Sequence, residues 1–242
     1  MSLTLALKGK NCVVLAADSR ITKGYTLEGP KTKDDSIKFV KINNYFGAMT
    51  YGLSDIGNRG IAALKEKISG SSSPAISYKD ILKAGLDIFV AKNIDWSQKN
   101  PQIPRKERDV GFIIGGYDED EKEFQIFNLE SPEFKAKKLL SGCLLAGQWH
   151  VAKFFTNLLF KPDLPNNILI DLVVLLLNET MTVEKTVGGE INLAIITQSK
   201  GFEWISKDKI NTHIKNNLKI KNQIKHLYNT GISDSKDMGL RQ

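Results

Sequence analysis

Apolar positions in the first fifty residues follow strand patterns and predict strands before any helix. LTLALKG alternates apolar and polar positions, GKN supplies a turn, and CVVLAAD at 12–18 is a continuous apolar run of strand length. Together they predict a hairpin with one well-buried strand. The polar stretch 24–36 predicts a loop, and IKFVKI and YFGAMTY predict a second hairpin that turns at Asn43 and Asn44.

Helical periodicity then replaces strand alternation. Isoleucines and leucines on roughly one face predict a helix that Ser54 or Asp55 caps and that ends near residue 68. A small break is predicted at 69–74, and a second helix follows at 77–92. The first half of the chain is therefore expected to place two helices after its opening strands.

The second half repeats this order of strands and helices. An exposed connection at 96–108 leads into strands VGFIIGGYD, EFQIFNLE and FKAKKLL, of which the first two turn at DEDEK. Two helices follow, and INLAIIT and FEWIS then close the sheet as a hairpin. A basic helix and a polar tail end the chain. The expected bounds of the three helices are 147–160, 167–186 and 207–228.

This element order predicts the fold class. Hairpins are too frequent for a doubly wound parallel sheet, so the simplest packing places two antiparallel sheets face to face with a pair of helices on each outer side. We therefore expect an α+β fold of the four-layer αββα sandwich type. We also expect one domain over 1–242, with its core at about 2–205 and the basic helix and tail at about 206–242.

Composition excludes several classes of function. The 242 residues are 41% hydrophobic and 25% charged, as in ordinary globular proteins, and the net charge of +7 arises largely from lysines between residues 207 and 225. A basic helix of this kind predicts a solvated face or a subunit contact rather than a nucleic-acid surface. The apolar run 168–177 contains Asp171 and is shorter than the roughly 20 residues that span a bilayer, so no membrane partner is expected.

The spacing of cysteines and histidines does not predict a cofactor site. Cys12 and Cys143 form no CxxC motif, which fits two structural thiols in a reducing compartment. With no secretion signal, a cytoplasmic location is expected. Metal-ligand spacing is lacking around the histidines, so we expect neither a metal nor another cofactor. The three histidines are His150, His213 and His226.

Ser2 opens the first strand and carries the candidate chemistry. Removal of Met1 would make Ser2 the free N-terminus, so one residue would supply a hydroxyl nucleophile and an α-amine whose ordinary pKa, roughly 7.7–8.0, suits a general base. Such a site needs a cation, an anion that holds the cation, and an oxyanion donor. Asp18 ends one strand and Lys38 opens the next, and both would reach Ser2 if these strands are neighbours.

Ordered motifs along the chain resemble β-type subunits of the proteasome family of N-terminal-nucleophile (Ntn) hydrolases. The motifs are SLTLAL, VVLAADSRITKG, KFVKIN, TYGLSD, FIIGGYD, LAGQ and VGGEINLAI, and they keep the family's order over roughly 2–205. The resemblance implies an amide-bond hydrolase whose substrate is a peptide or protein. It also implies a homo-oligomeric ring that encloses the active sites and that works with an unfoldase in some members.

The resemblance assigns roles residue by residue. It implies that Ser2 is the nucleophile, Asp18 the aspartate, and Lys38 the lysine that lowers the amine's pKa. Tyr51, next to Gly52, takes the place of the oxyanion donor, which is a backbone N–H. Two further residues match the family's site, Thr22 as the substrate-strand contact and Glu184 as the aspartate that precedes the SGG turn.

Two hydroxyls of the family's pattern are replaced in this chain. Ala146 stands for the serine of GSGQ, and Val187 stands for the serine of SGG. A nucleophile without its orienting groups loses rate, so a non-catalytic ring subunit is the first alternative. An amidase or peptide ligase, in which an amine replaces water at the acyl-enzyme, is the second.

Overall fold

The computed structural model describes residues 2–26, 29–70, 77–104 and 107–230. Several predictions fall wholly or partly outside these residues. They concern removal of Met1, the loop at 24–36, the break at 69–74, the connection at 96–108 and the polar tail after residue 228.

The first antiparallel sheet has the strand order β10-β1-β2-β11-β12. The predicted hairpin of β1 and β2 is confirmed, with Leu5 opposite Ala16, and so is the hairpin of β11 and β12. The edge strand β10 was not predicted, because CLLAG is short and runs directly into a helical pattern. The strands are β1 (Leu3–Lys8), β2 (Cys12–Asp18), β10 (Cys143–Gly147), β11 (Ile191–Thr197) and β12 (Gly201–Trp204).

The second antiparallel sheet has the order β5-β6-β7-β8-β9. Its two predicted hairpins are confirmed: β5 pairs with β6, and β7 pairs with β8 over the whole length of β7 except Val110. The third predicted strand, 134–140, is only two residues long. The strands are β5 (Phe39–Lys41), β6 (Phe46–Gly52), β7 (Val110–Asp118), β8 (Glu123–Glu130) and β9 (Lys137–Lys138).

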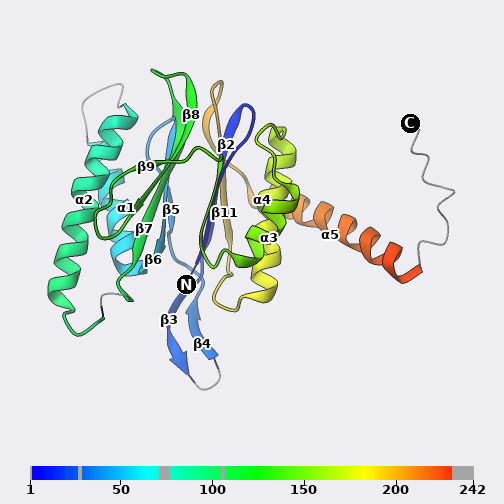
Figure 1. Ribbon diagram of the computed structural model, residues 1–242, viewed down its shortest axis with the longest axis horizontal. Helices are drawn as coiled ribbons and strands as arrows, with labels where there is room; N and C mark the ends of the chain where they lie inside the picture. The colour runs from blue at the N-terminus through cyan, green and yellow to red at the C-terminus, as the bar shows by residue number, and fades with distance from the viewer. Residues whose placement is uncertain (1, 27–28, 71–76, 105–106, 231–242) are drawn as a thin grey trace.

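A separate two-stranded hairpin replaces the predicted polar loop at 24–36. β3 (Ile21–Thr26) pairs with β4 (Gly29–Lys33), with a bulge between Thr22 and Gly24. Neither strand carries an apolar face, so hydrophobic periodicity could not reveal it. Figure 1 shows the hairpin projecting below the two sheets, near the start of β1.

Five helices are seen among the described residues. α2 runs seven residues past its predicted end at 92, and Trp96, expected in an exposed connection, is buried. Neither Ser54 nor Asp55 caps α1, because Leu53 occupies the N-cap position and makes no side-chain cap bond. The helices are α1 (Ser54–Ser69), α2 (Tyr78–Lys99), α3 (His150–Leu159), α4 (Asn166–Val183) and α5 (Lys207–Thr230).

Three hydrophobic clusters hold these elements together. One joins the two sheets through residues such as Leu15, Met49 and Ile113. A second joins the sheet of β5 to β9 to α1 and α2. A third joins the other sheet, which contains β1 and β2, to α3, α4 and the start of α5. Figure 1 shows these helix pairs on opposite outer sides of the molecule. The α+β class with antiparallel sheets is therefore confirmed.

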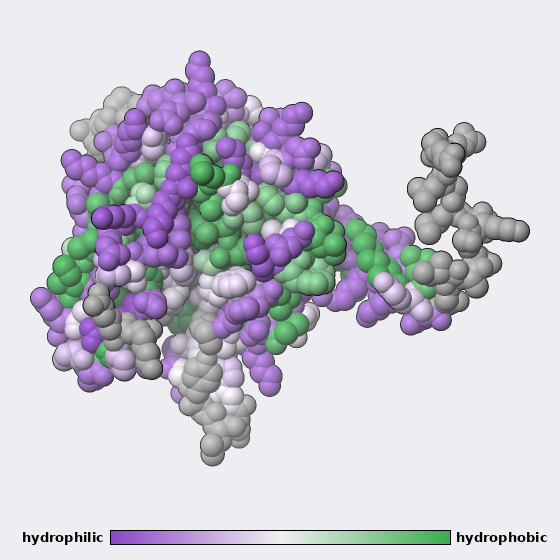
Figure 2. Space-filling model, in the orientation of Figure 1, coloured by the Kyte–Doolittle hydropathy of each residue, from purple (hydrophilic) through white to green (hydrophobic). Residues whose placement is uncertain are grey.

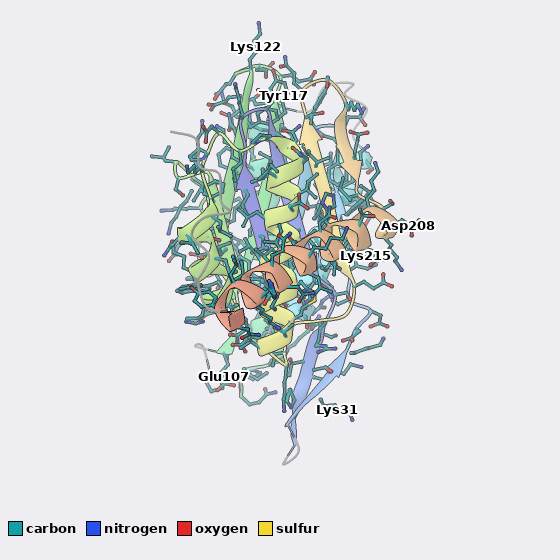
Figure 3. All side chains as sticks on the ribbon, turned by 90° about the vertical axis from the view of Figure 1, so that its right-hand side faces the viewer. Lys31, Glu107, Tyr117, Lys122, Asp208 and Lys215 are labelled. Carbon is teal, nitrogen blue, oxygen red and sulfur yellow. The ribbon has the colours of Figure 1, made fainter. Side chains whose placement is uncertain are left out.

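α4 and α5 form the outer part of this arrangement. α4 is long and apolar enough to cross a membrane by composition, yet its buried residues, including Leu169, Val173 and Leu176, pack in the core against β1 and β2. α5 lies across α4 in Figure 3. His213 Nδ1 lies 2.6 Å from an Asp171 carboxylate oxygen at their contact. The outer half of α5 extends beyond the body and exposes apolar side chains (Figure 2).

Candidate active site

Asp18 ends β2 with a fully buried carboxylate that four donors surround. Its Oδ1 accepts hydrogen bonds from the backbone N–H of Leu3 and from Lys38 Nζ, both at 2.9 Å. Its Oδ2 accepts from the backbone N–H groups of Arg20 and Gly188, both at 3.1 Å. A buried carboxylate is costly unless it is paired and hydrogen-bonded, and these four donors satisfy both oxygens.

Lys38 is the charge partner of Asp18, although the strands are not neighbours as predicted. β2 and β5 belong to different sheets, and Lys38 reaches Asp18 because it directly precedes β5 on the facing sheet. The Lys38 side chain is 2% exposed and also donates to the Arg20 carbonyl. Burial lowers the pKa of Lys38, and the Asp18 carboxylate opposes that shift. The lysine is therefore a buried cation with a weakened hold on its proton.

Ser2 is fixed at the tip of β1 by its neighbours. Its carbonyl accepts a hydrogen bond from the Gln148 N–H at 2.8 Å, and the next N–H, that of Leu3, binds Asp18. Gly147 passes so close that an added Cβ would lie 1.8 Å from the Ser2 carbonyl oxygen. Gly147 also has a φ of +86°, which glycine adopts without strain. Sequence reasoning missed the part that Gly147 and Gln148 play behind Ser2.

A cleft of about 620 Å³ opens beside Ser2. The start of β3, with Thr22, lines one part of the cleft, and residues 52–54 line another. Glu107 and Asp109 also contribute to its wall. The predicted substrate contact Thr22 thus lies in the same cleft as Ser2, between two backbone segments that suit an extended peptide.

The two predicted oxyanion donors point in different directions. Leu53 N–H donates to the carbonyl of Asp109, the residue before β7, and because ladder bonds alternate, Tyr51 N–H faces β7 as well. Thr50 N–H donates to the Lys38 carbonyl at 2.9 Å, on the opposite side. By the same alternation, we infer that Gly52 N–H, two residues later, faces that side. Gly52 lines the cleft beside Ser2. Gly52 is therefore the better placed donor.

Tyr51 contributes its side chain rather than its N–H. Its hydroxyl lies 2.7 Å from Glu130 Oε1 and 3.0 Å from Asn128 Oδ1. Burial and then the Glu130 carboxylate raise the pKa of Tyr51, so its phenol stays protonated. The ring lies against Gly111, where an added Cβ would be 2.1 Å from the ring. Tyr51 thus forms a fixed wall of the small gap beside Ser2.

Arg20, which sequence reasoning left without a role, ties the site to the turn after α4. Its guanidinium binds Asp34 through two bonds of 2.7 and 2.8 Å and donates to the Lys185 carbonyl at 3.1 Å. The hydrogen bonds from Arg20 lower the pKa of Asp34. The signal was present in ADSR, whose arginine follows the predicted catalytic aspartate by two positions.

The remaining predicted site residues lie around this group. Glu184 is the C-cap of α4. Its N–H donates to the Thr180 carbonyl at 2.8 Å, and its own carbonyl accepts from the Val187 N–H at 2.9 Å. Ala146 faces Thr4 across β10 and β1, and the Thr4 hydroxyl is buried with no partner among the described residues. Within those residues no cluster of three metal-ligating side chains is found.

Solved structures similar to this chain include Anbu proteins. No family model matches the chain, and no curated protein matches it. An Anbu (Gly-1) mutant from Hyphomicrobium sp. strain MC1 matches with a TM-score of 0.69 at 15% identity, over 93% of this chain and 96% of that chain. Anbu, the ancestral beta-subunit, from Yersinia bercovieri matches with a TM-score of 0.69 at 10% identity, over 92% and 95%. Anbu from Pseudomonas aeruginosa, solved as a helical assembly, matches with a TM-score of 0.71 at 13% identity, over 93% and 96%.

These matches correct the resemblance inferred from the sequence. The prediction of a proteasome β-type subunit was wrong, because no family model supports it and the structural neighbours are Anbu proteins. At these identities the similarity shows the fold and carries no site residue across. The chain thus has the proteasome-like fold that it shares with Anbu, described as an ancestral beta-subunit.

Proposed function

We propose that this protein is an amide-bond hydrolase with a four-layer αββα Ntn-hydrolase fold and Ser2 as its nucleophile. One observation carries the proposal. The Asp18 carboxylate binds both the N–H that follows Ser2 and the buried ammonium of Lys38, at the edge of a cleft that Ser2 lines. This arrangement supplies a fixed hydroxyl, a cation and a cleft wide enough for a peptide chain.

The reaction proceeds through an ester to Ser2. Once Met1 is removed, the α-amine of Ser2 takes the proton from its own hydroxyl, and Oγ attacks the substrate carbonyl carbon. The Gly52 N–H stabilises the oxyanion, and the protonated α-amine then gives its proton to the leaving amine as the C–N bond breaks. Water then attacks the ester as the same amine takes its proton. The amine gives this proton to Oγ as the C–O bond breaks, so that Ser2 is regenerated and the carboxylic acid leaves.

Lys38 and its partners set the electrostatics of these steps. Its positive charge beside the α-amine disfavours a second cation there, so the amine stays largely neutral and acts as a base at neutral pH. Asp18 holds the lysine, and Arg20 with Asp34 holds the turn whose Gly188 N–H binds Asp18. Glu184 acts in this proposal through the same turn, which begins where α4 ends.

An acylating probe tests the proposal directly. We expect the intact mass of the protein to lack Met1 and the probe to label the wild type on Ser2 but not the Ser2→Ala variant. Ser199→Ala, in the turn between β11 and β12, is the control and should label like the wild type. Retention of Met1, or equal labelling of Ser2→Ala, would overturn the proposal.

A non-catalytic structural subunit is the second candidate. Ala146 and Val187 favour it, because the proteasome pattern has a hydroxyl at both positions and the Thr4 hydroxyl, opposite Ala146, has no partner among the described residues. A protein that lacks Met1 and yet fails to label would support this function. A ligase differs by its products: an added amine would then appear in an amide with the acyl group instead of a free acid.

We further propose that the protein assembles with copies of itself, in the cytoplasm and on peptide or protein substrates. The Pseudomonas aeruginosa neighbour is described as a helical assembly, and α3 and α5 of this chain expose large apolar side chains such as Phe154, Leu158 and Ile224. Sedimentation at rising concentration should show species larger than the 27.0 kDa chain. A single 27 kDa species at every concentration would contradict assembly and would leave rings and an unfoldase partner without a basis.

A further inference from the structure

Asn58, on the first turns of α1, lies where two hollows beside Ser2 meet. With Ser2 and Lys38 it lines the small gap next to the nucleophile. With Ile21, Ser36 and Val40 it also lines a separate cavity of about 400 Å³. Ile21 is shared between that cavity and the cleft. The cavity is therefore the space that a substrate side chain next to the scissile bond would enter.

The Asn58 side chain has one satisfied end and one free end. Its Nδ2 donates to Ser36 Oγ at 3.0 Å. Its Oδ1 is shielded from solvent and has no hydrogen-bond partner among the described residues. A buried acceptor without a donor is costly, so this oxygen favours a ligand that brings an N–H. The Ser36 hydroxyl accepts from Asn58 and keeps its own proton for an acceptor on the same ligand.

Charge around the cavity separates neutral from charged ligands. Lys38 stands at one end beside Ser2, and Lys33 lines the other end. Each lysine already has a carboxylate partner, Asp18 for the first and Asp35 for the second. Asp35 lines the same end as Lys33 and is already paired with it, so a cationic head group would meet an ammonium group at each end and no unpaired carboxylate. A carboxamide carries both a donor and an acceptor and adds no charge.

We propose that Asn58 and Ser36 make this cavity a binding site for an uncharged carboxamide side chain, so that the protein cleaves next to glutamine or asparagine in preference to apolar or charged residues. The apolar walls at Ile21, Val40 and Ile61 suit the methylene stem of such a side chain. This inference rests on the proposed hydrolase function and names the substrate class of the same site.

Peptides that differ at one position test the preference. The set places glutamine, methionine, lysine or glutamate before the scissile bond, and methionine matches the length of glutamine without its hydrogen bonds. We expect kcat/KM for the glutamine peptide to exceed the methionine value by about tenfold, as for one hydrogen bond to an otherwise unpaired buried group. Asn58→Leu should abolish this difference. Equal rates for glutamine and methionine, or a higher rate for lysine, would overturn the inference.

Controls separate this inference from the hydrolase proposal. Asn93 on α2 also has a buried Oδ1 without a described partner but lines a different cavity, so Asn93→Leu should keep the glutamine preference. Binding of uncleaved peptides to Ser2→Ala measures the side-chain preference without turnover, and there too glutamine should bind about tenfold more tightly than methionine. Selective binding by Ser2→Ala with no cleavage by the wild type would refute the hydrolase alone. Cleavage without selectivity would refute the carboxamide site alone.

Discussion

Single charges at this site are stable only as members of a hydrogen-bonded group. Asp18 and Lys38 have side chains 0% and 2% exposed. Both carboxylate oxygens of Asp18 accept hydrogen bonds, and Lys38 Nζ donates to Asp18 and to the Arg20 carbonyl. Removing one member of a buried pair leaves the other charged and without its partner. The contribution of the pair to the stability of the fold can therefore be measured separately from the catalytic role proposed for it.

Lys38→Met should destabilise the fold by about 3–5 kcal/mol, because the Asp18 carboxylate would lose its buried cation. Urea denaturation at neutral pH measures the change. The double variant Asp18→Asn with Lys38→Met should be more stable than Lys38→Met alone, since it removes the unpaired charge. A single variant as stable as the wild type would show that the pair does not hold the site.

The Arg20–Asp34 pair predicts a dependence of stability on pH. Arg20 holds the pKa of Asp34 below 3.8, so the pair stabilises the fold above that pH and its contribution is lost as the pH falls through the lowered pKa. Because the pair is partly exposed, Asp34→Asn should cost only about 0.5–1 kcal/mol at pH 7. Denaturation near pH 2 should find the variant and the wild type alike, whereas a gap that persists there would contradict this cause.

Much of the candidate site could be predicted at the residue scale, because its groups sit in short motifs. Ser2, Asp18 and Lys38 were predicted and do come together. They do so through a contact between the two sheets, whereas the prediction placed Asp18 and Lys38 on neighbouring strands. The choice of Gly52 over Tyr51 depends on which way each N–H faces in the ladder, and a sequence pattern does not carry that information.

Among the elements, β10 shows how a short strand positions Ser2. It pairs with β1 from Cys143 opposite Leu7 to Gly147 opposite Leu3, and so runs along all of that strand except its last residue, Lys8. Gly147 ends β10 in close contact with the Ser2 carbonyl. A strand of five residues therefore determines where the hydroxyl lies.

Gly147→Ala should displace Ser2 and greatly reduce its labelling by an acylating probe. Gly142, before the same strand, is the matched control, because its φ of +73° is also left-handed but an added Cβ there would have its nearest neighbour at 3.6 Å. Both alanines carry backbone strain of about 1–2 kcal/mol, and only Gly147→Ala adds the clash. Gly142→Ala should therefore unfold slightly earlier and still label. Equal labelling of the two variants would contradict the role assigned to Gly147.

Elements were predictable where burial dictated the pattern. Continuous or alternating apolar runs revealed β1, β2, β7 and β11, as well as α4. The hairpin of β3 and β4 was missed because its pairing relies on backbone bonds between polar strands, with Gly29 at φ +125° at the start of β4. The true end of α2 was missed for the opposite reason: Trp96 packs into the core from a stretch that reads as polar.

At the scale of the whole molecule, close approach of the two sheets depends on glycines that face large side chains. Leu15 of β2 is fully buried and points at Gly115 of β7, where an added Cβ would lie 2.9 Å from a leucine methyl carbon. The next nearest atom to that Cβ, in Val13, is 3.5 Å away. Leu15 and Gly115 thus fit together as a pair.

Gly115→Ala should destabilise the fold by about 1–3 kcal/mol through overpacking, and Leu15→Ala by about 2–5 kcal/mol through a cavity. In the Leu15→Ala background the same Gly115→Ala change should cost much less, because the methyl group enters the space that the leucine vacated. A double-mutant cycle measured by urea denaturation gives the coupling. Strict additivity would show that the sheets do not meet at this pair.

The bond from the Gly188 N–H to Asp18 joins residues 170 positions apart in the chain. Contacts of such separation form late in folding, since a long loop must close before they stabilise anything. The carboxylate behind Ser2 therefore gains its last donor only when three quarters of the chain has been made and both sheets are in place. A nascent or partly folded chain would carry Ser2 without the buried charges behind it. In the proposed hydrolase, this connection would therefore delay activity until both sheets have formed.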